Sequence, residues 1–190
     1  MIIKNFLITG RPGIGKTTCM LRIISLLSKQ GLRIGGFITR EVREYGKRIG
    51  FLIQTFPEME EVYLASTRYD NGPRIGKYIV NLDNLENVGV PSIKRALESS
   101  NIVVIDEIGP MELLSKVFKK IVLEAFNSDK PIVATIHFKA RRYPFGKRLL
   151  ARSDIIVYEL TLDNREHIYR KITDDILDMI NFKGLKRNFV

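Results

Sequence analysis

A short stretch near the N-terminus constrains the fold of this chain more than any other. The residues Gly10-Arg11-Pro12-Gly13-Ile14-Gly15-Lys16-Thr17 match the pattern G-x-x-x-x-G-K-[ST] at every fixed position. An apolar run of strand length, residues 2–8, precedes the pattern, and apolar residues at helical spacing follow it until Gly31. A strand, a glycine-rich loop and a helix form the context in which this pattern binds phosphate.

The residue types in the loop have a physical reason. Glycines allow successive backbone N–H groups to point inward around a phosphate, and the following helix adds its positive N-terminal end. Lys16 supplies a cation for the β- and γ-phosphates, and the Thr17 hydroxyl becomes a ligand of Mg²⁺. The pattern therefore predicts a site for a nucleoside triphosphate with Mg²⁺ as its cofactor.

Length and composition set the broad class of protein. The 190 residues, 45% hydrophobic and 27% charged, suit one domain with a single core, which we place at 1–180. The lone Cys19 excludes an internal disulfide and indicates a reducing compartment. Residues 1–190 contain neither an apolar run of membrane-spanning length nor a signal-peptide pattern, so we expect a cytoplasmic protein without a membrane partner.

The net charge of +10 has two interpretations. A basic protein can bind nucleic acid, or its positive field can favour polyphosphates. Basic residues gather around 139–152 and in the tail, which we place at 181–190, and solvated surface is the ordinary role of both groups. The basic residues are Lys139, Arg141, Arg142, Lys147, Arg148 and Arg152, and then Lys183, Lys186 and Arg187.

An antiparallel insertion is predicted at about 37–80. Two weakly alternating runs that meet near Tyr45-Gly46 indicate a β-hairpin, and two further short strands follow at 62–65 and 77–80. The candidates for an arginine that stabilises the transition state are Arg43 and Arg48 near the hairpin turn, which we favour, and Arg142 and Arg148 in the later basic segment. The alternative is that the hairpin pair are solvated turn residues.

A continuous apolar run at 101–105 ends in Asp106 and Glu107. Such a run indicates a strand buried on both faces of a parallel sheet, and ligands bind such sheets beyond the carboxyl ends of the strands. We expect Asp106 to hold Mg²⁺ through a water, and Glu107 to act as the general base that polarises the attacking water. The alternative is an ordinary strand end at the surface.

The remaining pattern alternates helices and strands. A helix capped by Asn81 and bent or divided at Pro91 precedes the acidic strand, and a helix at 111–126 follows it, with Leu114, Val117, Phe118, Ile121 and Ala125 on its core face. A buried strand at 131–136 brings Thr135 or His137 toward the γ-phosphate, although His137 is more simply a polar strand end. After a last strand at 155–158, Asp163 and Glu166 resemble a capping box for the final helix, in which Ile168, Ile172, Ile176 and Ile180 repeat.

Four stretches resemble one family, the small P-loop nucleoside-triphosphatases first known from thermophiles, which has a cancer-related human member. These stretches are GRPGIGKTT, GFITREVREYGKRIGF, RIGKYIVNLDNLE and IDEIGPMEL. The resemblance spans the chain to about residue 180; the arginine-rich segment 137–152 and the tail depart from it. It implies hydrolysis of several nucleoside triphosphates to diphosphate and phosphate with Mg²⁺. The nucleotide-binding residues that it implies are Gly10, Arg11, Pro12, Gly13, Ile14, Gly15, Lys16, Thr17 and Thr18, together with Ile102, Val103, Val104, Ile105, Asp106, Glu107, Ile108 and Gly109.

These observations predict a three-layer α/β P-loop NTPase fold, a mostly parallel sheet with a small antiparallel insertion. The pair of acids also resembles the division of P-loop proteins that has an extra strand, and this resemblance implies that strand 132–136 lies between the strand of the phosphate loop and the strand of Asp106. For function, we expect a Mg²⁺-dependent triphosphatase in which Lys16 and Glu107 are catalytic, with broad base tolerance. The alternatives are a nucleotide or nucleoside kinase with a small acceptor, and a nucleic-acid-associated ATPase that rests on net charge alone.

Overall fold

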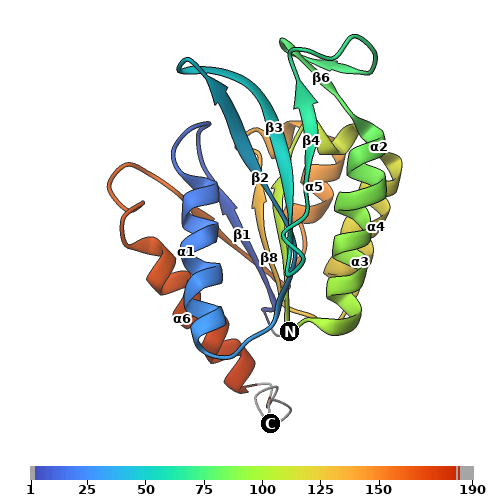
Figure 1. Cartoon of the computed structure of the whole chain (residues 1–190). Coiled ribbons are helices and arrows are strands. Elements are labelled where there is room, and N and C mark those ends of the chain that lie inside the picture. The colour runs from blue at the N-terminus through green and yellow to red at the C-terminus, as the bar shows by residue number, and fades with distance from the viewer. Residues whose placement is uncertain (1–2, 183, 185–190) are drawn as a thin grey trace.

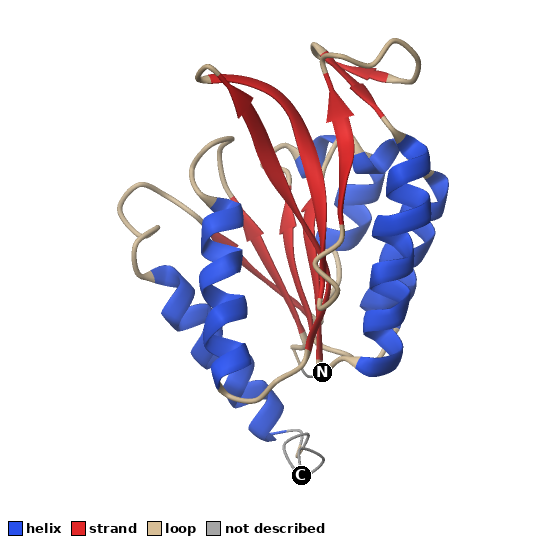
Figure 2. Cartoon of the chain, viewed as in Figure 1, coloured by secondary structure: helices blue, strands red, loops and turns tan. Residues whose placement is uncertain are grey.

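A single nine-stranded sheet organises the computed structural model, which describes residues 3–182 and 184 (Figure 1). The strand order is β5-β6-β4-β3-β2-β7-β8-β1-β9. Figure 2 shows helices on both faces of this sheet. The strands are β1 (Asn5–Thr9), β2 (Ile34–Glu44), β3 (Lys47–Phe56), β4 (Glu61–Ser66), β5 (Arg74–Ile75), β6 (Tyr78–Val80), β7 (Ile102–Ile108), β8 (Ile132–Ile136) and β9 (Ile155–Glu159). The α-helices are α1 (Lys16–Lys29), α2 (Leu82–Asn84), α3 (Val90–Ser99), α4 (Lys116–Asn127), α5 (Pro144–Leu150) and α6 (Ile168–Phe182).

The parallel part of the sheet consists of β2, β7, β8, β1 and β9. Successive side chains of a strand point to opposite faces, and Ile102 and Val104 pack with the core under α1 and α6, whereas Val103 and Ile105 pack with the core under α3 and α4. The strand is therefore covered on both sides, as its continuous apolar run predicts. The α/β class is confirmed, and β8 lies between β7 and β1 as predicted.

The predicted insertion extends this same sheet. β2 pairs in parallel with β7 only as far as Phe37, and beyond this point it pairs antiparallel with β3 alone. Tyr45 and Gly46 both have positive φ, which is the conformation of a two-residue hairpin turn. β4, β6 and β5 continue the antiparallel order, so the insertion builds a tall sheet edge beside the phosphate loop (Figure 1).

The helix predicted before the acidic strand is divided, but before Pro91 rather than at it. Asn81 caps α2 by accepting a hydrogen bond from the Asn84 N–H at 2.9 Å. A π-helical turn at Leu85–Gly89 then leads into α3, and Pro91 lies in the first turn of α3. Proline has no N–H to donate, so it is tolerated at a helix start and interrupts the hydrogen-bond ladder elsewhere.

The predicted helix at 111–126 begins later than expected. Residues Glu112–Leu114 form a 3-10 turn, and Ser115 caps α4 by accepting from the Phe118 N–H at 2.9 Å. The prediction that Leu114 and Val117 face the core is wrong, because they are 37% and 45% exposed. Leu114 precedes the cap, and Val117 lies one residue, about 100° of helix, away from the buried Phe118.

The C-terminal third contains two further corrections. The capping box at Asp163 and Glu166 is wrong: α6 begins at Ile168, and Thr161 and Asn164 instead exchange hydrogen bonds in the preceding turn. The arginine-rich loop contains the helix α5. The tail residues Lys183, Lys186 and Arg187 lie outside the described residues.

In the part of the chain that the structure describes, no helix combines the length and apolarity needed to cross a membrane.

Phe118 anchors α4 in the core. Its side chain is fully buried, and its ring lies 6.2 Å from the ring of Phe37 on β2. Phe118→Ala should lower the free energy of unfolding by about 3–5 kcal/mol, because the lost contacts leave a cavity. Val117→Ala, on the exposed face of the same helix, should change it by no more than about 0.5 kcal/mol. Urea unfolding measures both; equal losses would contradict this account of the helix face.

Candidate functional site

The phosphate loop joins the end of β1 to the start of α1. Gly13 and Gly15 have φ values of 75° and 108°, a region that favours glycine, and Gly15 is the residue before the first helical turn. No side chain of the described residues caps this helix start, and its first turn carries no acidic residue. Its backbone N–H groups and the positive end of the helix therefore face the loop, where they suit a phosphate.

Lys16 connects the loop to the acidic strand. Its Nζ donates to the Gly10 carbonyl at 3.3 Å and lies 3.7 Å from Glu107 Oε2. The side chain is only 9% exposed. The ammonium is thus held between the loop and β7, at the place where phosphate oxygens lie in a loop of this type.

Asp106 is enclosed by two hydroxyl groups. Thr17 on α1 donates to its Oδ2 at 2.7 Å, and Thr135 on β8 donates to its Oδ1. The carboxyl group is 1% exposed, and its burial raises the pKa to about 6, against the two hydroxyl donors, which lower the pKa. The position of β8 between β7 and β1 is what brings Thr135 within reach.

Glu107 differs from its neighbour in how its oxygens are satisfied. Burial raises the pKa of the Glu107 carboxyl, whereas the charge of Lys16 lowers it. Oε2 faces Lys16, but Oε1 is buried and has no hydrogen-bond partner among residues 3–182 and 184. A buried carboxylate oxygen without a partner is costly, so Oε1 is suited to accept a hydrogen bond from a water or substrate hydroxyl.

The oxygens of Thr17 and Asp106 fit Mg²⁺. This ion prefers hard oxygen ligands and is usually bound through one or two carboxylates together with waters and substrate phosphates. Among the described residues, no group of three or more His, Cys, Asp or Glu could hold a metal ion. The protein thus supplies a partial ligand set that a bound triphosphate would complete.

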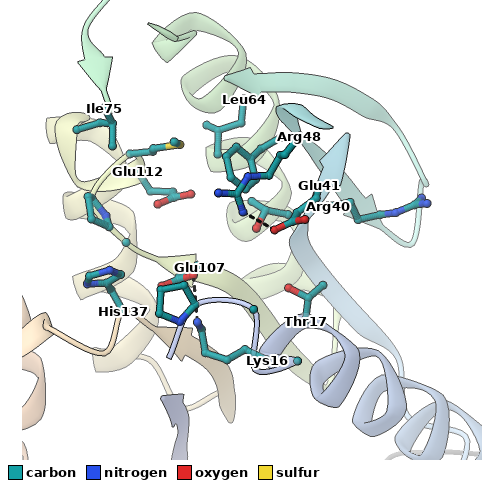
Figure 3. A pocket seen from close by; sticks show the side chains of 18 of the residues that line it. Lys16, Thr17, Arg40, Glu41, Arg48, Leu64, Ile75, Glu107, Glu112 and His137 are labelled. Carbon is teal, nitrogen blue, oxygen red and sulfur yellow. Dashed lines mark hydrogen bonds and ion pairs between the residues drawn. The ribbon is translucent and has the colours of Figure 1, made fainter. Parts of the chain in front are cut away.

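A cleft of about 610 Å³ opens above these residues (Figure 3). Pro12, Gly13, Gly15, Lys16, Thr17 and Thr18 line it from the loop, and Glu107, Gly109 and His137 line it from the ends of β7 and β8. His137 has its pKa lowered by burial and then by the charge of Lys16, which favours the neutral imidazole. Gly10 and Arg11 line a second cavity of about 390 Å³ with Phe138, Arg141 and Glu159.

Some residues that the resemblance implied lie elsewhere. Five of them are buried in the sheet: Ile102, Val103, Val104, Ile105 and Ile108. Neither these side chains nor Ile14 line either of the two described cavities.

The hairpin arginines line the first cleft, where Arg43 pairs with Glu41 at 2.7 Å and Arg48 donates to the Tyr78 hydroxyl at 2.8 Å. Arg142 and Arg148 line neither described cavity.

Glu112 is a site residue that sequence reasoning missed. It is 5% exposed and lies in the cleft, where Gly109 permits its approach: a Cβ on Gly109 would lie 3.0 Å from Glu112 Oε2 and 3.3 Å from Glu107 Cγ. Burial, with the Glu107 charge, raises the pKa of Glu112 to about 8. The signal for it in the sequence is an acidic residue inside the apolar stretch 111–114, which the helical pattern places in a helix.

Comparison with known proteins then decides the family. A sequence model described as NTPase matches residues 5–173. The chain belongs to this NTPase family. Nucleoside-triphosphatase THEP1 of Thermofilum pendens is 45% identical over 180 residues, which cover 95% of this chain and 99% of that protein. THEP1 of Methanocaldococcus jannaschii is 44% identical over 170 residues, 90% and 95% of the two chains.

Two solved structures of this NTPase family agree with the fold. The crystal structure of THEP1 from Aquifex aeolicus has a TM-score of 0.77 and 32% identity, and the match covers 88% of this chain and 96% of that one. The solution structure of a human cancer-related nucleoside triphosphatase also has a TM-score of 0.77 and 32% identity, with 90% and 96% covered. The family resemblance predicted from four short stretches is confirmed.

The raised pKa of Glu112 predicts a pH-dependent stability. The folded-state pKa of Glu112, about 8, lies above its ordinary value of 4.5. The protonated carboxyl therefore contributes its full stabilisation of the fold at pH values below 4.5, and this contribution is lost as the pH rises through about 8. Glu112→Gln should therefore lose less unfolding free energy than the wild type over this range. Asp106 titrates in both proteins, so the difference isolates Glu112. Urea unfolding at each pH, with exposed Glu124→Gln as control, measures it; parallel curves for Glu112→Gln and wild type would refute it.

Proposed function

We propose that the protein is a Mg²⁺-dependent nucleoside-triphosphatase that hydrolyses ATP, GTP and other triphosphates to diphosphate and phosphate. The observation that carries this proposal is the buried Oε1 of Glu107, which has no hydrogen-bond partner in the described part of the chain and lies beside Lys16 at the phosphate loop. A water that donates to Oε1 would stand next to the terminal phosphate. The name nucleoside-triphosphatase, which the relatives bear, supports the same reaction.

In this mechanism the loop and α1 bind the phosphates through backbone N–H groups, and Lys16 places its charge on the β- and γ-phosphate oxygens. Glu107 orients a water and accepts its proton while the water oxygen bonds to the γ-phosphorus and the bond to the bridging oxygen breaks. Thr17, and Asp106 through a water, would hold Mg²⁺, which supplies positive charge to the phosphates. Thr135 positions Asp106 through its hydroxyl.

Broad base tolerance belongs to this proposal because every group assigned above would contact phosphate or Mg²⁺, and all nucleoside triphosphates share the phosphates.

We also propose a cytoplasmic location. Cys19 is a buried free thiol, and burial raises its pKa to about 11; unpaired cysteine is typical of reducing compartments.

Phosphoryl transfer to a small acceptor is the second candidate function, and the extent of the cleft beyond Glu107 favours it.

Glu107→Gln tests the general base. The variant keeps the shape of the side chain but cannot accept a proton, so turnover of MgATP should fall by about two to four orders of magnitude while binding changes little. Phosphate release and nucleotide titration measure the two quantities. Lys16→Ala is the contrasting variant, since it should lose both hydrolysis and part of the affinity. Loss of binding together with turnover in Glu107→Gln would make Glu107 structural.

Asp106→Asn tests the proposed Mg²⁺ side of the site. The neutral amide is a poorer partner for a hydrated cation, so the concentration of Mg²⁺ at half-maximal phosphate release should rise. Thr135→Val removes one of the two hydroxyl donors but keeps the carboxylate, and should raise it less. An Mg²⁺ dependence identical to that of the wild type in Asp106→Asn would assign the metal to other residues.

An arginine at the hairpin is the proposed source of further positive charge in the transition state. Arg43→Ala or Arg48→Ala should lower kcat at least about tenfold with little change in KM. Arg142→Ala and Arg148→Ala are the matched controls, because these arginines lie outside the cleft. Near-normal kcat in both hairpin variants would remove the hairpin from the transition state.

A further inference from the structure

The cleft extends well beyond the position that a nucleophilic water needs. The cleft has a volume of about 610 Å³, and its lining runs from the phosphate loop past Glu107 to Leu64, Ile75 and Glu112. In Figure 3, Glu107 lies between Lys16 and a distal group of side chains that includes Leu64, Ile75 and Glu112. We call this part the distal chamber, and the residues that define it are Arg48, Phe51, Leu64, Ile75, Met111 and Glu112.

In the proposed mechanism, the distal chamber would lie on the side from which the nucleophile approaches. In the proposed mechanism Glu107 orients the attacking group, so this group lies between Glu107 and the γ-phosphate, opposite the leaving diphosphate. The distal chamber adjoins Glu107 on the face away from Lys16 (Figure 3). A molecule held there could present a hydroxyl group where water otherwise stands.

Most of the chamber wall is apolar. Leu64 and the partly buried Phe51, Ile75 and Met111 belong to the core cluster that extends under α3 and α4. The Phe51 ring packs edge-on against Tyr78, with centroids 5.1 Å apart, which fixes its orientation. Apolar walls with a few placed polar groups are typical of sites for small organic molecules.

Arg48 gives the chamber a fixed cation. Its Nε donates to the Tyr78 hydroxyl, its Nη1 pairs with Glu41, and its guanidinium lies 5.0 Å from the Phe51 ring centroid. Within the described residues Nη2 makes no hydrogen bond, so its two donors remain for a ligand. Glu41 is shared with Arg43, and this trio carries one excess positive charge. Such a wall attracts an anion.

Glu112 does not oppose that attraction. Its carboxyl is buried and predominantly neutral at pH 7, since burial raises its pKa to about 8. A neutral carboxyl can both donate and accept a hydrogen bond, and therefore suits a ligand hydroxyl. The chamber thus combines an apolar wall, one anion-binding cation and one neutral polar group.

We propose that the distal chamber binds a small organic anion with an apolar body and a hydroxyl group, and that this hydroxyl accepts the γ-phosphoryl group. The hydroxyl oxygen bonds to the γ-phosphorus, the bond to the bridging oxygen breaks, and the electron pair leaves with the nucleoside diphosphate. Glu107 takes the hydroxyl proton, and the product is a phosphomonoester. The inference rests on the proposed function, and hydrolysis is then the reaction of water in the acceptor's place.

A matched pair of probes tests this inference on the full chain. 4-(Hydroxymethyl)benzoate has a carboxylate, an apolar ring and an alcohol, and 1,4-benzenedimethanol has the same ring without the charge. NMR titration should show saturable binding of the carboxylate at chamber residues and binding at least about tenfold weaker for the diol, because the charge-assisted bond is lost. With MgATP, ³¹P NMR should show the phosphomonoester of the carboxylate probe.

Variants localise the site. Ile75→Trp, which fills the chamber from the short edge strand β5, should weaken the carboxylate probe at least about tenfold. Arg48→Lys should do so because it removes the Nη2 donors and their fixed position while it keeps the positive charge. Val117→Trp, on the exposed face of α4, should bind the probe as the wild type does. Arg48→Lys carries the test alone if Ile75→Trp does not fold.

Three outcomes would overturn the inference: no saturable binding, equal affinity for both probes, or unchanged affinity in the folded chamber variants. Binding without phosphomonoester would overturn the acceptor role. Phosphate release from ATP by the wild type without probe is measured in parallel. Its absence would overturn the proposed function, whereas its presence without probe binding would overturn the inference alone.

Discussion

The burial of Asp106 and the partial burial of the adjacent Glu107, at the end of β7, form the constraint on which the rest of the site depends. Burying an ionised carboxyl is costly unless hydrogen bonds or an opposite charge offset it. Asp106 receives two hydroxyl donors, from Thr17 and Thr135, whereas Glu107 faces Lys16 and keeps one oxygen without a partner among the residues that the structure describes. The same contacts tie the phosphate loop, β7 and β8 together, so the geometry of the loop follows from how these acids are satisfied.

The strand order explains why these contacts exist. β8 separates the strand of the phosphate loop from the strand of the acids, and so a hydroxyl on β8 reaches Asp106 from one side while α1 reaches it from the other. The insertion continues the sheet past β2 (Figure 1), and residues of β3 and β4 line the same cleft as the phosphate loop. One sheet therefore supplies the phosphate-binding end and the far wall of the cleft.

Local patterns predicted much of this. The fixed positions of the loop, the apolar run of β7 and the paired acids depend on short-range sequence, and the strand order followed from the resemblance of the acid pair to one division of P-loop proteins. The starts of helices were harder to predict. Ser115 caps α4, so this helix begins after the apolar residues that precede Ser115, and Thr161 and Asn164 form the turn before α6 in place of the predicted capping box at Asp163. Glu112 was missed because its role depends on burial against Gly109 and Glu107, which arises only when the turn after β7 folds back.

The central claim is that Glu107 Oε1 holds the nucleophile for the γ-phosphate. A crystal structure with Mg²⁺ and a non-hydrolysable triphosphate tests it most directly. The account predicts a water within hydrogen-bond distance of Oε1 and in line with the γ-phosphorus, with Lys16 drawn from Glu107 to the phosphate oxygens. A γ-phosphate bound away from Glu107, or Oε1 paired with a protein group in that complex, would contradict it.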